Sequence, residues 1–429
     1  MPSRRRLLVG AAGISGAVGT TVTAAALAGT EPILADGGED ADRADRADRA
    51  DHTDRIEWPL ARYDPAGTAH NPDASGPKSP PELAWRQDTD STMHGLTAPI
   101  LVGDTLYGVG RDSLVAFDRD TGEIQFERSG SYWSTPARAE ATAYRSDTLA
   151  VYSRTGVYGL SADGGYELLG RPIGTERWHA PGQDTSNWSS SSAREPAPVA
   201  ADGTVYAVIP ETDRVAALDA SSGQQQWEQV VGKERSIGTN QPVVSDDTVY
   251  VSSTPGDLVA FDAETGATRW QAHPAPREES PLQYREFQAP TVTDAGIVVP
   301  DRQGVALFDR ADGSLVWDYF HDGNGTDGSA AVADGMVFVT DGTESLHAVA
   351  LETGEREWTA EYSPDTHPIV ADGVVYLGYQ MSELVAIDAD TGDRRWTYEE
   401  AIYFSQPIAA DGVLYVFGDE GLMALEEGS

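Results

Sequence analysis

The side chains that could do chemistry in this chain are mainly aromatic and basic, and they fall in variable segments between repeated ones. The longest such segment, residues 172–196, contains arginine, histidine and two tryptophans, and residues 273–288 contain a second group. Aromatic rings and guanidinium groups often anchor protein interfaces, so we predict a binding rim. Its candidate residues are Trp133, Arg177, Trp178, His179, Trp188, Arg194, Tyr284, Arg285 and Tyr403. The alternative is that Trp178 and Trp188 only pack the loop or fill a channel.

Signals for catalysis are weak. The chain has no cysteine, which excludes disulfides, thiolate catalysis and cysteine-bound metals. Neither His-Glu-x-x-His nor Gly-x-Ser-x-Gly occurs, and the eight histidines are scattered. Residues 322–328 carry oxygen ligands at a spacing similar to that of a calcium loop, but the glycine stands one place off the EF-hand pattern. We assign no catalytic residue and no metal ligand, and we expect a flexible acidic turn at residues 322–328.

The charge of the chain is strongly acidic, with 30 Lys and Arg against 69 Asp and Glu and a formal net charge of −39. The basic residues are almost all arginine, and the lysines are Lys78 and Lys233. This composition resembles that of proteins from extremely halophilic archaea; the alternative is an ordinary soluble acidic protein. A nucleic acid is a poor partner in both cases, because its phosphates would be repelled.

The amino terminus has the pattern of an export signal. Residues 3–8 read Ser-Arg-Arg-Arg-Leu-Leu, which resembles the twin-arginine motif, and an apolar Ala/Gly-rich stretch follows to about residue 28. We expect residues 1–30 to direct export to the cell surface or the outside, or to remain as a membrane anchor. Residues 31–80 are predicted to be an acidic, low-complexity tether, because their Ala-Asp-Arg repeats lack apolar periodicity. In an exported protein, Asn187 and Asn324 are plausible glycosylation acceptors.

A repeated phrase fills the rest of the chain. Each copy contains four short apolar segments, with an Asp-Gly turn such as Asp372 and Gly373 after the first segment. A Thr-Gly turn follows the third segment, and a tryptophan stands four residues after that glycine. Asp-Gly suits a tight hairpin because both positions adopt positive φ. The tryptophans predicted to pack between neighbouring sheets are Trp85, Trp227, Trp270, Trp317, Trp358 and Trp396.

The motif Ala-x-Asp-x-x-x-Gly-x-x-x-Trp resembles the tryptophan-docking motif of pyrroloquinoline-quinone (PQQ) repeat proteins. The resemblance covers residues 81–429 and implies an all-β, eight-bladed propeller of four-stranded antiparallel blades. Seven blades are complete, and the eighth, from residue 406, lacks a fourth strand that residues 82–86 are predicted to supply, closing the ring. Blade 2, predicted at residues 135–171, departs most from the motif, with Leu168 in the tryptophan position. We expect it to be the loosest blade.

The resemblance offers two classes of function. One branch contains quinoprotein dehydrogenases, which hold PQQ between a tryptophan and a vicinal cysteine pair beside calcium. The other contains the non-enzymatic lipoprotein that assists outer-membrane assembly. Because the cysteine pair and the calcium constellation are not evident here, we favour an exported, monomeric scaffold that binds a protein or peptide at the cell envelope without a cofactor. The alternative is a PQQ- and calcium-dependent alcohol or sugar dehydrogenase, so enzymatic activity stays an open question.

The charge predicts a dependence of stability on salt. Uncompensated carboxylates repel one another in dilute buffer, and molar salt shortens the screening length to about 3 Å. We expect the melting temperature to rise between dilute buffer and molar salt. Thermal unfolding followed by circular dichroism across this range tests the prediction, and an unchanged melting temperature would contradict the halophilic interpretation.

Overall fold

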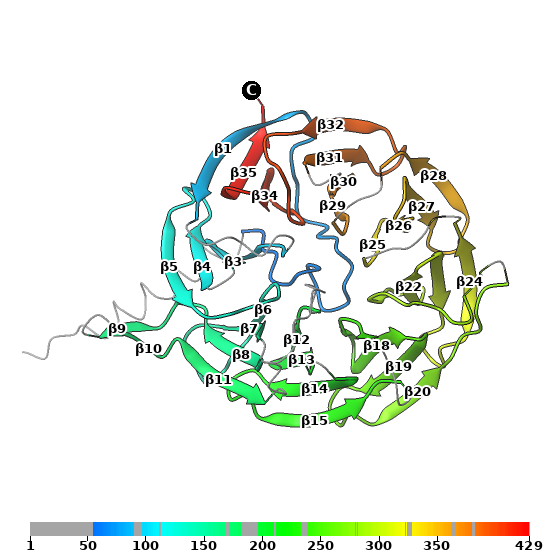
Figure 1. The fold of residues 1–429 in the computed structure, drawn as a ribbon, viewed down its shortest axis with the longest axis horizontal. Helices are drawn as coiled ribbons and strands as arrows, with labels where there is room; N and C mark the ends of the chain where they lie inside the picture. The colour runs from blue at the N-terminus through cyan, green and yellow to red at the C-terminus, as the bar shows by residue number, and fades with distance from the viewer. Residues whose placement is uncertain are drawn as a thin grey trace, which may run out of the picture. The chain divides into compact units, whose positions relative to one another are not determined.

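The computed structural model shows eight four-stranded antiparallel sheets arranged as the blades of a propeller (Figure 1). This confirms the predicted fold class. The structure describes residues 55–428 apart from 90–96, 111–112, 154, 169–170, 182–195, 210–211, 233–237, 279, 281, 322, 324–327, 363–365 and 380–381. No helix among these residues is long and apolar enough to cross a membrane.

The strands of each blade run outward from the channel to the rim. Blade 1 consists of β2 (Ile100–Val102), β3 (Thr105–Val109), β4 (Ser113–Asp118) and β5 (Ile124–Ser129). Blade 2 consists of β6 (Ala137–Ala139), β7 (Thr148–Ser153), β8 (Gly156–Ser161) and β11 (Glu176–Pro181). Blade 3 consists of β12 (Val199–Ala201), β13 (Thr204–Val208), β14 (Arg214–Asp219) and β15 (Gln225–Val230). Blade 4 consists of β17 (Val243–Ser245), β18 (Thr248–Thr254), β19 (Asp257–Asp262) and β20 (Thr268–Ala272). Blade 5 consists of β21 (Thr291–Val292), β22 (Ile297–Asp301), β23 (Gly304–Phe308) and β24 (Leu315–Phe320). Blade 6 consists of β25 (Ala331–Ala333), β26 (Met336–Thr340), β27 (Leu346–Ala350) and β28 (Arg356–Ala360). Blade 7 consists of β29 (Ile369–Ala371), β30 (Val374–Tyr379), β31 (Glu383–Asp388) and β32 (Arg394–Tyr398). Blade 8 consists of β33 (Ile408–Ala410), β34 (Val413–Phe417), β35 (Gly421–Glu427) and β1 (Pro81–Asp88). The short strand β16 (Gly238–Thr239) also pairs with β18.

The turns form as their residues dictate. Asp202, Asp334, Asp372 and Asp411 have φ between 46° and 50°, and the glycine that follows each also has positive φ. Between the third and fourth strands, an aspartate at the end of the third strand accepts hydrogen bonds from the turn amides. In blade 7, for example, Asp388 accepts from Thr391 N at 3.0 Å. These turns hold the strands in the register that buries both faces of each inner strand.

Neighbouring blades are joined by tryptophans on the outer strands. In each of six junctions the indole N–H donates to a backbone carbonyl of the next blade or of the segment before β1, at 2.8–3.0 Å. The pairs are Trp178 to Ala220, Trp227 to Ala263, Trp270 to Arg310, Trp317 to Leu351, Trp358 to Ala389, and Trp396 to Pro77. The ring packs on the glycine of the neighbouring turn, as Trp227 does on Gly266. Trp85 packs in the same way on Gly122.

Blade 2 differs from the prediction. Its fourth strand is β11, and Trp178, which is buried, occupies the docking position that we had given to Leu168. A hairpin of β9 (Tyr166–Leu168) and β10 (Arg171–Ile173) is inserted before β11. This insertion lengthens the spacing between the turn glycine and the tryptophan, so the constant spacing of the motif misplaced the strand. Trp178 therefore belongs to the core and is not part of a binding rim.

The junction between blades 1 and 2 uses a different pair of residues. Phe126 stands where the motif has tryptophan, and it packs on Gly164. The phenylalanine side chain has no N–H to donate, but Arg128 Nε donates to the Gly164 carbonyl at 2.7 Å. The Arg128 guanidinium also lies 4.9 Å from the centre of the Phe126 ring. Phe126 thus supplies the apolar ring, and Arg128 supplies the hydrogen-bond donor, that a single tryptophan provides at the other junctions.

The segment before β1 lines the channel, where we had predicted a solvated tether to residue 80. Its carbonyls accept hydrogen bonds from the innermost strands of six blades in chain order (Figure 1). The donor and acceptor pairs are Leu101 to Trp58, Arg138 to Pro59, Val244 to Pro65, Val292 to Ala66, Val332 to Thr68, and Val370 to Ala69. The compact unit begins at Asp54, so the residues after it are packed with the blades, before the boundary predicted at residue 81. Residues 1–53 lie outside the described part.

Arg62 holds this channel segment to blades 5 and 6. Its side chain is buried and donates to the carbonyls of Pro290, at 2.7 Å, and Gly67, and to the Thr291 hydroxyl. A further bond reaches the Ala330 carbonyl at 3.3 Å. Burial lowers the pKa of the Arg62 guanidinium to about 10. Carbonyl oxygens compensate part of the cost of burying this cation.

The closing strand forms as predicted. β1 pairs antiparallel with β35, with Trp85 opposite Ala424 and a register shift between Leu83 and Trp85. The sheet order β1-β35-β34-β33 therefore combines the first strand of the chain with its last three. The ring is closed by hydrogen bonds and packing, without a covalent link.

The channel segment predicts a sharp effect of truncation. A chain beginning at Asp54 should melt like the longer chain, because it retains the ring of carbonyl acceptors. A chain beginning at Pro81 loses the six carbonyl acceptors of the innermost strands and the buried Trp58 side chain, so its melting temperature should fall by at least about 10 °C. Calorimetry of both chains in molar salt measures the difference, and equal melting temperatures would show that the channel segment does not contribute to stability.

Candidate functional site

The connections of the blades gather on two opposite faces. The loop face carries the connections between blades and those between second and third strands, while the turn face carries the other two kinds of turn. Contacts agree with this division: Ile402, between blades, donates to Asp419 of a second-to-third connection at 2.7 Å. On the turn face, Arg310 of blade 5 pairs with Asp246 of blade 4 at 2.5 Å.

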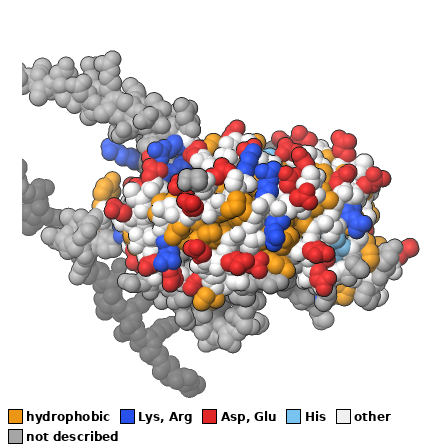
Figure 2. Space-filling view, turned by 90° about the horizontal axis from the view of Figure 1, so that it is seen from above, with side chains coloured by type: hydrophobic (Ala, Val, Ile, Leu, Met, Phe, Trp, Pro, Cys, Tyr) orange, Lys and Arg blue, Asp and Glu red, His pale blue; other side chains and the backbone are white. Residues whose placement is uncertain are grey.

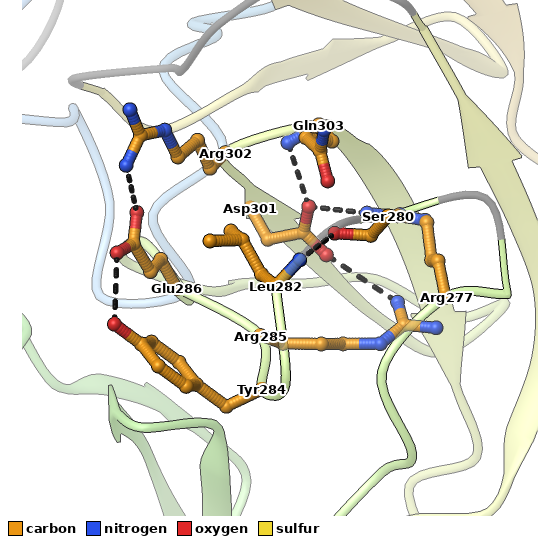
Figure 3. A pocket seen from close by; sticks show the side chains of 9 residues that line it. All are labelled: Arg277, Ser280, Leu282, Tyr284, Arg285, Glu286, Asp301, Arg302 and Gln303. Carbon is orange, nitrogen blue, oxygen red and sulfur yellow. Dashed lines mark hydrogen bonds and ion pairs between the residues drawn. The ribbon is translucent and has the colours of Figure 1, made fainter.

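The most highly organised part of the loop face lies at the entry to blade 5. Arg277 and Arg285, from the connection between β20 and β21, have side chains only 4% exposed. Arg277 pairs with Asp301, at the end of β22, and reaches Asp318 of β24 at 2.6 Å. Arg285 reaches Asp318 at 2.5 Å and Asp301 at 3.4 Å. Two buried cations and two carboxylates thus form a four-residue cluster that fixes the incoming loop. Figure 3 shows three of its members, Arg277, Arg285 and Asp301.

A second polar chain flanks this cluster. Tyr284 donates its hydroxyl to Glu286 at 3.3 Å, and Glu286 pairs with Arg302 at 3.2 Å (Figure 3). Arg302 is 39% exposed, so this chain faces solvent whereas the cluster behind it does not. A small pocket lies between them; its lining residues are Arg277, Ser280, Leu282, Tyr284, Arg285, Glu286, Asp301, Arg302 and Gln303. It combines donors and acceptors around one apolar side chain, which suits a polar contact with a partner better than covalent chemistry.

The other predicted rim residues do not converge on one site. His179 stacks on Tyr158, with ring centres 4.2 Å apart, on the outer part of blade 2. Arg177 lies toward the turn face and bonds Ser146 at 2.7 Å. Trp133 Nε1 donates to Ser131 at 2.9 Å.

Tyr403 lies between blades 7 and 8, where burial and the charge of Asp419 raise the pKa of its hydroxyl. Trp188, Arg194, Asn187 and Asn324 lie outside the described residues. The predicted rim is therefore a set of separate positions, of which Tyr284 and Arg285 share a site.

Sequence reasoning missed the two carboxylates of the blade 5 cluster. Asp301 belongs to a recurring position, because an aspartate also stands at the second-to-third connection in blades 4, 6 and 8 as Asp257, Asp341 and Asp419. Asp257 pairs with His273, and Asp419 accepts from Ile402 N. This recurrence was visible in the sequence and could have indicated that these aspartates fasten the loops. Asp318 offered no such signal.

Two observations bear on the alternative of a quinoprotein dehydrogenase. In the part of the chain that the structure covers, no group of three His, Asp or Glu side chains is placed to hold a metal ion. The channel axis is lined by the segment from Trp58 to Ala69, including the buried Arg62, where carbonyl oxygens already occupy the inner strand edges.

Comparison with known proteins decides the family. A model of PQQ-type repeats, described as outer membrane protein assembly factor BamB, matches residues 168–398 and 301–427. The chain belongs to this family. BamB of Yersinia pestis is 26% identical over 279 residues, which is 62% of this chain and 69% of the relative.

Solved structures share the propeller. BamB from Moraxella catarrhalis superposes with a TM-score of 0.61 at 16% identity, over 81% of this chain and 99% of that one. The quinohemoprotein alcohol dehydrogenase of Comamonas testosteroni gives 0.65 at 16% identity, over 89% and 82%. At such identity the likeness to BamB and to the dehydrogenase shows the fold alone.

The buried cluster predicts a large difference between two arginines. Arg277→Met leaves the buried Asp301 with a weaker partner, so the free energy of unfolding should fall by about 3 kcal/mol. Arg302→Met removes an exposed pair with Glu286 and should cost less than about 1 kcal/mol. Denaturant unfolding of both variants in molar salt measures this, and equal losses would mean that the cluster does not hold the loop.

Proposed function

We propose that this protein is an exported scaffold of the cell envelope that binds a protein or peptide partner through its loop face at blade 5. The observation that carries the proposal is the locked loop between β20 and β21. Two buried arginines fasten it to β22 and β24, so the partly exposed groups of Tyr284, Glu286 and Arg302 are held in place before any partner arrives. Pre-organisation reduces the entropy that binding would otherwise cost.

The chemistry of this surface favours a macromolecular partner. Phenol, carboxylate and guanidinium groups lie side by side above an apolar Leu282, which is a mixture typical of protein interfaces. At the loop-face end of the outer strand β24, Phe320 is 37% exposed. The Yersinia relative is named as an assembly factor for outer membrane proteins, which supports a role in protein contact.

The amino terminus and the charge of the chain indicate where the protein works. We propose that the protein is exported by the twin-arginine route as a folded monomer and works at the cell surface in concentrated salt. Its first residues either stay as a membrane anchor or are removed, which releases the protein. Figure 2 shows acidic side chains over much of the visible face of the rim, around a band of apolar ones. A surface of this kind stays soluble in high salt through its carboxylates, while its apolar groups remain available for contact.

Site-directed photo-crosslinking tests the loop face. The chain has no cysteine, so Tyr284→Cys and Asp312→Cys each give one attachment point for a benzophenone label, on the loop face and the turn face of blade 5. In native membranes at molar salt, we expect the label at position 284 to capture one protein in stoichiometric yield and the label at 312 to capture none. Equal capture from both positions, or none from 284, would refute the proposed site.

A further inference from the structure

Blade 2 carries two enlarged connections on the turn face. Residues 140–147 join β6 to β7, whereas six other blades use two residues there and blade 5 uses four. Residues 162–175, with the β9–β10 hairpin, join β8 to β11, whereas the other covalent connections of this kind use five or six. The hairpin projects from the ring in Figure 1. No requirement of propeller closure explains these additions, since the other blades close without them.

Arg177 ties the two connections together. It donates to Ser146 of the first connection at 2.7 Å and to Ser161, where the second begins, at 3.0 Å. A third bond reaches the Thr148 hydroxyl at 2.8 Å, and the guanidinium lies 4.1 Å from the centre of the Tyr144 ring. The projection is therefore held in one arrangement by hydrogen bonds at its base.

The hairpin base is fixed on its other side as well. Asp163 accepts from Gly165 N at 3.0 Å and from the Ser161 hydroxyl at 2.5 Å. Arg128 of blade 1 donates to the Gly164 carbonyl. Blade 1, the hairpin and the longer turn thus form one supported unit.

This unit exposes apolar side chains. Tyr166 is 70% exposed, Ile173 is 48% exposed and Tyr144 is 44% exposed. They are three of the ten large hydrophobic side chains that are exposed in the described part of the chain. Tyr166 and Ile173 are direct cross-strand partners, so they share one side of the hairpin. Apolar groups displayed on a fixed support are typical of a docking surface.

The charges of this surface indicate what docks there. Arg177 is held by hydroxyl groups and has no carboxylate within ion-pair distance among the described residues. Its nearest acids are already engaged, since Asp147 pairs with Arg138 at 2.8 Å and Asp163 caps the hairpin. Beside it, Arg145 is exposed. In concentrated salt only charges in direct contact interact strongly, so this cation can attract a carboxylate although the whole chain is acidic.

We propose that the turn face of blade 2 is a second binding surface, which takes an acidic partner segment with apolar side chains next to its carboxylates. Tyr166 and Ile173 contact the apolar groups, and Arg177, stacked on Tyr144, pairs with a carboxylate. A second copy of this chain is the less suitable occupant, because each copy carries a net charge of −39 and the same exposed arginines would meet across a two-fold axis.

The test uses fluorescein-labelled eight-residue peptides of alternating Glu and Leu, with alternating Lys and Leu as the charge-reversed probe. Fluorescence anisotropy in molar salt should show binding of the Glu-Leu peptide and clearly weaker binding of the Lys-Leu peptide. Tyr166→Ser with Ile173→Ser should raise the Kd about tenfold or more. Hydrogen exchange should slow on binding within residues 140–147 and 162–176.

The matched control is Ile402→Ser, which removes a side chain 73% exposed on the loop face and should leave the Kd unchanged. Because Tyr166 and Ile173 are exposed, their replacement should leave the melting temperature unchanged, which separates lost binding from lost folding. Absent binding, equal binding of both peptides, or an unchanged Kd in the double variant overturns the proposal. So does a dimer in sedimentation that the double variant dissociates, since the occupant would then be a second copy. None of these results bears on capture from position 284.

Discussion

The structure depends on one repeated junction, in which an outer-strand aromatic side chain packs on the turn glycine of the next blade. The indole buries a large apolar area, and its N–H satisfies a carbonyl that would otherwise be shielded from water. Because each blade touches only its two neighbours, stability is close to a sum over such junctions. In a closed ring every blade has a neighbour on both sides, so the ring closes only when each of the junctions forms. The junction between blades 1 and 2 illustrates this demand, since Phe126 and Arg128 divide between them what one tryptophan does elsewhere.

A second constraint acts at the channel. The innermost strands have one edge without a neighbouring strand, and unpaired edge groups are costly when they are buried. The segment from Trp58 to Ala69 supplies carbonyls to six of these edges in succession. Further along the chain, before β1, the Pro77 carbonyl accepts the Trp396 indole N–H where blade 8 has no covalent turn between its last two strands. The amino-terminal part therefore completes the ring at its inner edge and again at its closure. With the axis so lined, contacts with other molecules are left to the two faces and the rim.

The fold could be predicted from the sequence because its determinants are local and repeated. The Asp-Gly turns and the Thr-Gly-to-Trp spacing recur in the chain, and the closing strand followed from a missing fourth strand in blade 8. Blade 2 was misjudged because the β9–β10 insertion changed the spacing that identifies the motif; Gly164 and Gly174 on either side of it were the available signal. The channel segment gave no signal, since it binds mainly through backbone carbonyls, which every residue has. The Arg277–Asp301 pair joins residues far apart in sequence, so only the three-dimensional structure could bring them together.

The departures from the repeat indicate where evolution had freedom to add function. Junction positions hardly vary because the ring fails without them, whereas connections can lengthen at little cost in closure entropy. Among the connections that the structure describes, this freedom has been used at two separated places: the loop before blade 5 and both turn-face connections of blade 2. In each, arginine fixes the added segment to the core, through carboxylates at blade 5 and through hydroxyls at blade 2. The difference matters for binding, because a guanidinium already paired with carboxylates only positions its loop, whereas one held by hydroxyls keeps its charge for a partner.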